Sequence, residues 1–188
     1  MVPLEVIVVD ADVLIPILSC DFLLTGLDLA IYELAVSPKV LDEVERHLIT
    51  DFPNQDPARL AIRAQRMRFA LRNSIVRDVR PTEAINAVNE KDRHVAMTAI
   101  TARATVAVTN DRRLRRQLSE ALPQLSPVSI DQFALHQFQR DAETLNAILE
   151  TMAGKRTRPT MTVDELVTRM AQQFPKFATN WRGTRGIG

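Results

Sequence analysis

Apolar positions along the chain form two patterns: short, mostly apolar runs, and longer stretches with helical spacing. The short runs predict strands over residues 4–9, 30–37, 105–110 and 126–130, and the run at 4–9 is typical of a strand buried on both faces of a parallel sheet. Apolar residues three and four positions apart predict helices over residues 37–48, 57–72, 89–104, 111–122 and 131–153. Strands that alternate with helices in this order predict an α/β fold with a mostly parallel central sheet.

Capping residues define the start of two helices. Ser37 precedes Pro38, which suits a first helical position, and the buried stripe of this helix is predicted at Val40, Leu41, Val44 and Leu48. Thr162 and Glu165 form a capping box before a separate amphipathic helix, which follows a basic linker at residues 154–159. Residues 73–90 are expected to be mostly loop, and the last seven residues to fray. We therefore divide the chain into an α/β domain, residues 1–138, and a helical C-terminal extension, residues 139–188.

Composition narrows the class of protein. With 46% hydrophobic and 25% charged residues, the 188-residue chain can bury a sizeable core, and its net charge of +1 does not indicate an acidic partner. A single cysteine, Cys20, excludes an internal disulfide and fits a reducing compartment. No apolar stretch reaches the roughly 18 residues that a membrane span needs, and no signal peptide is visible. We expect a soluble, cytoplasmic protein that does not associate with membranes.

Acidic residues stand at the ends of two predicted strands. Asp10 follows the strand at 4–9, and Asp111 follows the strand at 105–110. If both strands belong to one parallel sheet, both carboxylates emerge at the edge where ligands bind in such sheets. Asp92 lies in the first turn of its helix on the face that is predicted to be buried. A purely structural alternative remains for Asp92 and Asp111, because acids are common helix caps.

Three acids crowd the helix that starts at Ser37. Its periodicity turns Asp42 away from the core and places Glu43 and Glu45 on opposite flanks, so periodicity does not choose between them. Carboxylates gathered at one sheet edge would repel each other unless a hard cation, Mg²⁺ or Mn²⁺, neutralised them. The scattered histidines do not form a zinc site, and no glycine-rich phosphate loop is present. A cation held by carboxylates is suited to phosphoryl chemistry.

The order of these acids resembles the PIN domain, the nuclease fold of VapC-type toxins. Four stretches carry the resemblance, which covers about residues 4–135: "VVDADVLI", "SPKVLDEVERHL", "DRHVAMTAI" and "AVTNDRRL". The tail "TMTVDELVTRM" is similar to the helical C-terminus of a subgroup of PIN proteins. The resemblance implies a PIN-like three-layer α/β/α nuclease domain over residues 1–138. It selects as metal-binding and catalytic residues Asp10, Glu43, Asp92 and Asp111.

Two departures from the family pattern concern neighbouring residues. Asp12 stands where the family usually has Asn. Some relatives place the last acid after Thr-x-Asn-x-x-Asp, whereas here Asn110 and Asp111 are adjacent, and we choose Asp111. Asp12, Thr109 and Asn110 are therefore accessory candidates.

The resemblance implies an Mg²⁺- or Mn²⁺-dependent endoribonuclease, the toxin of a type II toxin–antitoxin module of the VapBC kind. Its partners would be an RNA substrate and a cognate antitoxin, with a homodimer or a hetero-oligomer with the antitoxin as the assembly. Two other classes stay open. One is a catalytically silent PIN scaffold that binds RNA or protein. The other is a phosphatase of the haloacid-dehalogenase type that uses Asp10 and Asp12, although its usual Thr or Val is replaced by Leu14.

Basic clusters suggest where RNA or an antitoxin would bind. Arg112 and Arg113 follow Asp111 directly, where a phosphate backbone would need positive charge. Arg63 and Arg66 share one face of the helix at 57–72, which also carries Leu60, Met67 and Leu71 at helical spacing. That helix is a candidate docking surface for an acidic, amphipathic antitoxin segment. The alternative is that its apolar stripe packs inside the monomer.

Overall fold

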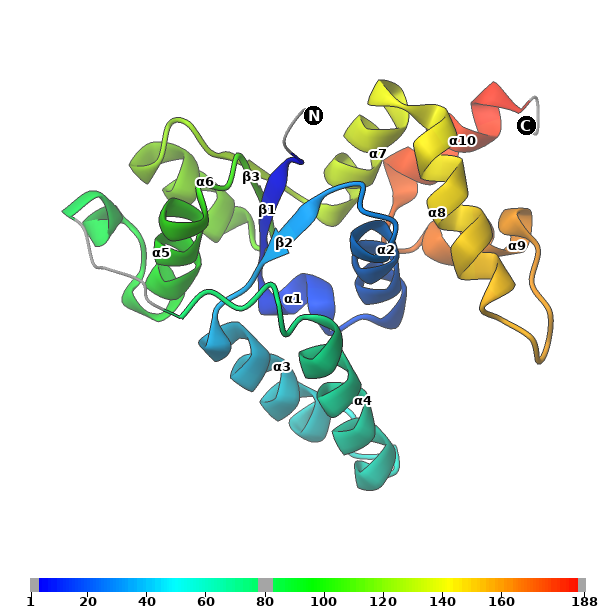
Figure 1. Cartoon of the computed structure of the whole chain (residues 1–188), viewed down its shortest axis with the longest axis horizontal. Coiled ribbons are helices and arrows are strands. Elements are labelled where there is room, and N and C mark those ends of the chain that lie inside the picture. Colours follow the sequence, from blue (N-terminus) through cyan, green and yellow to red (C-terminus); the bar gives the residue numbers. More distant parts are fainter. Residues whose placement is uncertain (1–3, 78–82, 186–188) are drawn as a thin grey trace. The chain divides into compact units, whose positions relative to one another are not determined.

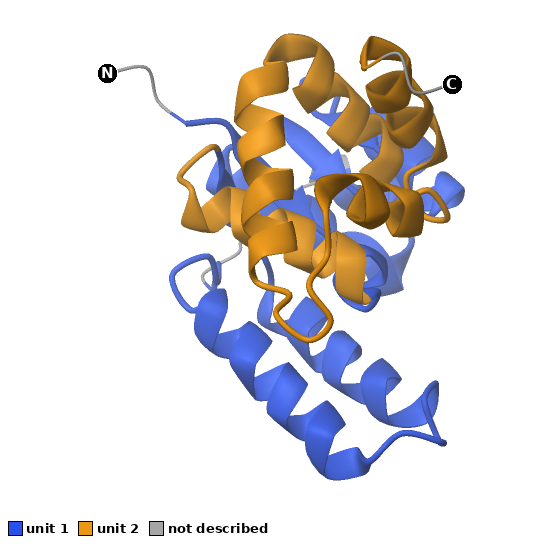
Figure 2. Ribbon diagram, turned by 90° about the vertical axis from the view of Figure 1, so that its right-hand side faces the viewer, with its two compact units in different colours: residues 1–16, 32–128 blue, residues 17–31, 129–188 orange. Residues whose placement is uncertain are grey.

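The structure is a computed structural model that describes residues 4–77 and 83–185 (Figure 1). The chain packs as two compact units, coloured separately in Figure 2. The first unit consists of Met1–Pro16 and Tyr32–Val128, and the second of Ile17–Ile31 and Ser129–Gly188. The first unit contains the sheet, and the second unit is helical.

The sheet in the described part of the first unit has four strands, and all its pairings are parallel. The strands are β1 (Val6–Val9), β2 (Glu33–Ala35), β3 (Val106–Val108) and β4 (Ser126–Val128), in the spatial order β2-β1-β3-β4. Val9 pairs with Val108, so β1 and β3 end level with each other. These strands fall within the predicted ones, and the α/β class with a parallel central sheet is confirmed.

The helices of the first unit follow the predicted order. They are α1 (Ala11–Leu14), α3 (Pro38–Thr50), α4 (Pro57–Ala70), α5 (Arg93–Ala102) and α6 (Arg112–Ala121), with 3₁₀ turns at Glu83–Ala87 and Glu90–Asp92. Ser37 caps α3 by accepting the Val40 N–H, and the stripe predicted for this helix is buried. The predicted helix at 89–104 begins instead with a 3₁₀ turn that Asn89 caps, so α5 itself starts at Arg93. Part of the predicted loop, residues 78–82, lies outside the described residues.

The apolar stripe of α4 is not a docking surface. Leu60, Met67 and Leu71 are buried, and α4 packs against α3. Of the two interpretations of this stripe, packing inside the monomer is therefore the correct one. The reason is that an isolated α3 would expose its own apolar face, which α4 covers.

The second unit contains α2 (Ile17–Asp28), α7 (Ile130–Arg140), α8 (Ala142–Gly154), α9 (Val163–Met170) and α10 (Pro175–Thr184). The helix predicted over 131–153 is two helices, because Asp141 leaves the helical conformation and caps α8. The capping box of Thr162 and Glu165 is confirmed. The prediction of a frayed tail is wrong for residues 182–184, which belong to α10, and residues 186–188 lie outside the described part. Within the described residues, no helix has the length and apolarity to cross a lipid bilayer.

A buried acid on α7 holds α10. Phe174, at the start of α10, provides no side-chain cap, and Asp131 accepts the N–H groups of Phe177 at 3.0 Å and Lys176 at 3.3 Å instead. Asp131 is only 8% exposed, so its carboxylate and these amide groups satisfy each other away from water. It therefore fixes one helix of the unit to the start of another.

We expect Asp131→Ala to lower the free energy of unfolding by about 2 kcal/mol, because it leaves buried N–H donors unpaired. Urea unfolding followed by circular dichroism measures this loss. Glu150→Ala, which removes an exposed acid from α8, is the matched control and should change stability little. Equal stability of the two variants would show that Asp131 does not hold α10.

Candidate active site

The carboxyl edge of the sheet opens into a pocket of about 470 Å³. All four acids selected from the sequence line it, although they come from separate segments of the chain: Asp10, Glu43, Asp92 and Asp111. Asp12 lines it as well. The remaining wall is formed by Ala11, Ile15, Pro16, Arg46, His47, Asp51 and Lys91. The structure therefore places the predicted site residues around one pocket, and the parallel direction of β1 and β3 accounts for Asp10 and Asp111.

Asp10 is held by both of its oxygens. Oδ1 accepts the Ala11 N–H at 2.7 Å and so caps α1, while Oδ2 accepts the Thr109 hydroxyl at 2.9 Å. Burial raises the pKa of Asp10, and the charge of Asp111 raises it further against these hydrogen bonds. Asp10 is therefore a fixed carboxylate in a position that disfavours its charge unless a cation is near.

Thr109 connects the end of β3 to the end of β1. Its hydroxyl donates to Asp10 and accepts the Asp111 N–H at 3.2 Å. Asp111 caps α6, as the structural alternative predicted, because its Oδ1 accepts the N–H groups of Arg113 at 2.7 Å and Leu114 at 3.1 Å. Both capping bonds are made to Oδ1, so a capping role does not use the second oxygen of Asp111.

Asp12 bridges α1 and the loop after β3. Its Oδ2 accepts the Asn110 N–H at 2.7 Å and lies 3.4 Å from the Thr109 hydroxyl. Its Oδ1 is buried, with no hydrogen-bond partner in the described part of the chain. Burial, together with the charge of Asp10, raises the pKa of Asp12 to about 7. The accessory candidates Asp12, Thr109 and Asn110 therefore form one hydrogen-bonded group behind Asp10.

The structure separates the three acids of α3. Asp42 and Glu45 accept hydrogen bonds from Arg68 Nη2 on α4, at 2.6 and 3.1 Å. Glu43 lines the pocket and Glu45 does not. The structure therefore decides between the two acids that periodicity left equivalent, in favour of Glu43. Burial raises the pKa of the Glu43 carboxyl, and Asp10 and Asp92 raise it further against nearby Lys39.

Asp92 occupies the N-cap position of α5 but makes no side-chain capping bond to the described residues. The alternative that Asp92 serves only as a helix cap therefore loses its main support. Burial raises the pKa of Asp92, and the charges of Asp10 and Asp111 raise it further, while Lys91 acts in the opposite direction. Lys91 Nζ lies 3.9 Å from Asp92.

His94 is a component of the site that the sequence analysis did not identify. It is 8% exposed, its Nδ1 lies 2.9 Å from Ser37 Oγ, and its Nε2 lies 3.5 Å from Glu43 Oε1. Burial lowers the pKa of His94 to about 4. This arrangement is not a nucleophilic triad, because Ser37 is 4% exposed and its hydroxyl oxygen caps α3.

The donor chemistry of the pocket fits a hard divalent cation. Its acids supply carboxylate oxygens, which Mg²⁺ and Mn²⁺ prefer. Within residues 4–77 and 83–185, no three Asp, Glu, His or Cys side chains converge closely enough to hold an ion as they stand. Carboxylates that raise one another's pKa values repel each other, which favours such a spread arrangement in the absence of a cation.

The arginines selected from the sequence have different surroundings. Arg112 and Arg113 are exposed at the start of α6, next to Asp111, and Arg66 is exposed on α4. Arg63 is tied to α1, because its guanidinium donates to the carbonyl oxygens of Leu14 and Ile15. Two further cations line the pocket itself, Arg46 and Lys91, and the sequence analysis missed both.

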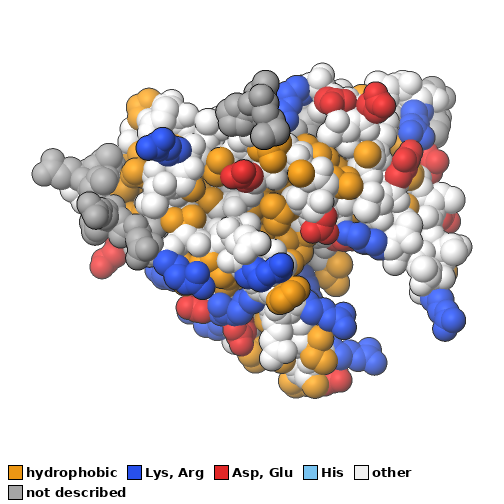
Figure 3. All heavy atoms as spheres, in the orientation of Figure 1, with side chains coloured by type: hydrophobic (Ala, Val, Ile, Leu, Met, Phe, Trp, Pro, Cys, Tyr) orange, Lys and Arg blue, Asp and Glu red, His pale blue; other side chains and the backbone are white. Residues whose placement is uncertain are grey.

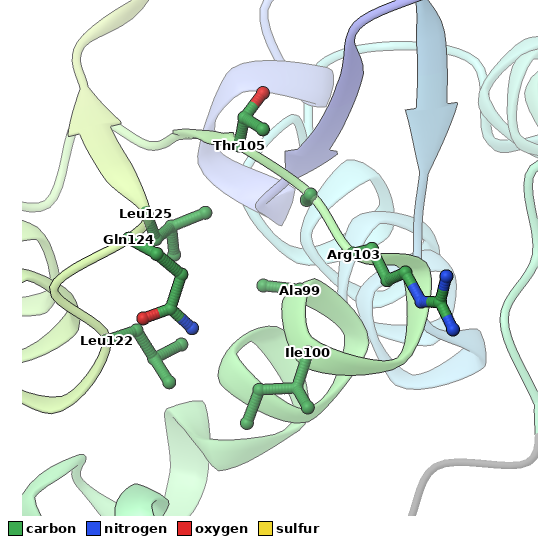
Figure 4. Close-up of a pocket in the computed structure, with 8 residues that line it drawn as sticks. Ala99, Ile100, Arg103, Thr105, Leu122, Gln124 and Leu125 are labelled. Atoms are coloured by element: carbon green, nitrogen blue, oxygen red, sulfur yellow. The ribbon is translucent and has the colours of Figure 1, made fainter. Parts of the chain in front are cut away.

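A second pocket, of about 260 Å³, lies at the opposite, amino edge of the sheet. Leu122, Gln124 and Leu125 face Ala99 and Ile100 across it, and the guanidinium of Arg103 points away (Figure 4). The described residues that line this pocket include no acid, in contrast to the pocket at the carboxyl edge.

The comparisons with curated proteins and with solved structures found no match. The comparison with family models matched the part of the second unit that contains α7 to α10. Residues 130–183 of this chain are similar to the family described as the VapC50 C-terminal domain.

Proposed function

We propose that this protein is a metal-dependent endoribonuclease and the toxin of a VapBC-like toxin–antitoxin module. The observation that carries the proposal is the pocket at the carboxyl edge of the sheet, which is lined by Asp10, Glu43, Asp92 and Asp111. The similarity of residues 130–183 to the VapC50 C-terminal domain supports the toxin class, because that domain takes its name from a VapC protein.

The residues of the pocket suit phosphodiester hydrolysis. The four acids would hold Mg²⁺ or Mn²⁺, which when bound polarises a phosphoryl oxygen and lowers the pKa of a bound water. Asp10 is oriented by Ala11 and Thr109, so its position would not have to be set when substrate binds. Arg46 and Lys91 supply positive charge to the pocket wall for a phosphate backbone.

A phosphatase mechanism through Asp10 and Asp12 has less support. Such a mechanism needs the second acid to exchange a proton with the leaving group. One oxygen of Asp12 is buried, and the other accepts the Asn110 N–H. Asp12 therefore lacks an oxygen that is free to meet a substrate.

Cleavage of a defined RNA panel, with and without Mg²⁺, tests the proposed function, with p-nitrophenyl phosphate as a phosphomonoester control. We expect RNA cleavage that stops when EDTA is added and no hydrolysis of the phosphomonoester. Hydrolysis of the phosphomonoester alone would favour the phosphatase, and RNA binding without cleavage would favour a silent scaffold.

The partner of a toxin should bind the outer face of α4. Ile62 is 48% and Phe69 is 69% exposed there, two turns apart on the side opposite the buried stripe. Arg66 lies between them, and Arg72 stacks on the Phe69 ring with its Cζ 4.2 Å from the ring centroid. Figure 3 shows Lys and Arg side chains beside hydrophobic surface over α3 and α4. This combination fits an acidic segment with an apolar face, which we assign to the antitoxin.

We expect a Phe69→Asp variant to bind the product of the adjacent gene at least tenfold more weakly, because an exposed aromatic anchor becomes a charge that repels an acidic partner. Binding by calorimetry measures the effect. Leu29→Asp, which changes another exposed hydrophobic side chain outside α4, is the control and should bind as the wild type does. Equal affinity of Phe69→Asp and wild type would rule out this face.

A further inference from the structure

His94 links the start of α3 to the acid that α3 contributes to the pocket. Ser37, the cap of α3, lies on one side of the imidazole ring, with its Oγ 2.9 Å from Nδ1. Glu43, nearly two turns further along the same helix, lies on the other side, with its Oε1 3.5 Å from Nε2. The ring itself comes from α5, immediately after Asp92 and Arg93. One imidazole thus connects two of the four segments that form the site.

The direction of these contacts follows from the chemistry of the partners. A carboxylate only accepts hydrogen bonds, so the tautomer that favours the 3.5 Å contact with Glu43 is the one with its hydrogen on Nε2. The Ser37 oxygen accepts the Val40 N–H at 3.1 Å, which leaves its own hydrogen available for Nδ1. In this tautomer Ser37 orients the ring together with a hydrogen bond to the backbone of Lys91, and the ring presents Nε2–H to Glu43.

His94 is less exposed than Lys39, the other basic side chain within 4.0 Å of the Glu43 carboxylate in the described part of the chain. Lys39 Nζ lies 4.0 Å from Oε1, but its side chain is 50% exposed, so water screens that ion pair. The His94 side chain is 9% exposed. Lys39 also donates to the Lys91 carbonyl oxygen at 2.8 Å. The two contacts of Glu43 therefore differ mainly in exposure: water screens the one to Lys39 and is largely excluded from the one to the buried His94 ring.

We propose that His94 is a positioning residue that, oriented by Ser37, holds the Glu43 carboxylate in place for divalent cation binding. The proposal rests on the metal-dependent site of the proposed function and adds a residue to it. Partners that orient metal-binding carboxylates typically contribute 10- to 100-fold to metal affinity.

Titration of Mn²⁺ by isothermal calorimetry tests this role without an activity assay. His94→Asn keeps a polar group beside Ser37 but is too short to reach Glu43, whereas His94→Gln places an amide near the position of Nε2. We expect His94→Asn to lower Mn²⁺ affinity about 10- to 100-fold, and His94→Gln to retain more of it. A purely structural histidine would give two variants with equal affinity, and that result would overturn the proposal.

A second pair of variants acts through Ser37 and tests the proposal even if His94→Asn does not fold. Ser37→Ala removes the hydroxyl that orients the ring, while Ser37→Thr keeps a hydroxyl and a cap. We expect the Ala variant to bind Mn²⁺ more weakly than the Thr variant. Equal affinities of this pair would overturn the proposal.

The results that would contradict the proposed function differ from those that would contradict the role of His94. If wild-type protein binds no Mn²⁺, both proposals are wrong. If wild type binds Mn²⁺, Asp10→Asn does not, and the His94 and Ser37 variants bind as wild type does, only the role of His94 is wrong.

Discussion

Asp10→Asn is expected to reduce Mg²⁺-dependent RNA cleavage roughly 10³-fold, because charge stabilisation by a bound cation amounts to several kcal/mol. Asn keeps an oxygen that can accept the Ala11 N–H, so α1 should remain capped. The variant also removes one of the charges that raise the pKa values of Glu43 and Asp92. Its thermal stability without metal should therefore equal or exceed that of the wild type.

Initial rates on one RNA substrate over a range of Mg²⁺ concentrations measure this loss. Asp42→Asn is the matched control, because Asp42 is on α3 but binds Arg68 and does not line the pocket. It should cleave RNA at the rate of the wild type. Asp10→Asn with full Mg²⁺-dependent activity would remove Asp10 from the site.

Asp12→Asn is expected to stabilise the metal-free protein relative to wild type by an amount that grows as pH rises from 4 to 7. The pKa of Asp12 is raised from 3.8 to about 7 in the folded protein, so the folded state binds the proton more tightly than the unfolded state. Wild type therefore loses stability as Asp12 ionises, and the variant does not. A pKa difference of this size corresponds to on the order of 4 kcal/mol.

The comparison must be made between the two proteins at each pH. The pKa of His94 is lowered to about 4, so its ionisation makes wild type more stable as pH rises from 4 to 6.5 and partly conceals the effect of Asp12. His94 is present in both proteins, so the difference between them isolates Asp12. Urea unfolding in EDTA at pH 5, 6, 7 and 8 gives that difference. A flat difference for Asp12→Asn across this range would show that Asp12 ionises normally.

The same variant tests whether Asp12 binds the cation. Asn keeps an oxygen for the Asn110 N–H and restores the residue that the resembled family usually has at this position. RNA cleavage by Asp12→Asn should therefore be close to that of wild type. A large loss of activity would place Asp12 among the metal ligands.

Most of the sheet and its edge could be predicted from the sequence, because both depend on local pattern and chain direction. Asp10 and Asp111 each follow an apolar run that forms a strand. Because these strands are parallel, both carboxylates lie at the same edge of the sheet. The buried stripe of α3 follows from its periodicity alone. The break at Asp141 did not follow, because one capping acid ends α7 and starts α8 inside a continuous helical pattern.

Features that depend on distant contacts could not be predicted. His94 meets Ser37 across 57 positions in the chain, and no local pattern distinguishes it from a histidine in the core. Periodicity left Glu43 and Glu45 equivalent, and only the approach of Arg68 from α4 separates them. The apolar stripe of α4 is equally suited to a partner and to α3, so only the packed structure decides that it is internal.

Crystals grown with Mn²⁺ show directly whether the acidic pocket binds a cation, because anomalous diffraction locates the ion without an assumption about substrate or activity. The account predicts one anomalous peak in the pocket, roughly 2 Å from a carboxylate oxygen of Asp10 and of at least one other acid among Glu43, Asp92 and Asp111. A peak that touches none of these four carboxylates, or no peak at saturating Mn²⁺, would contradict it.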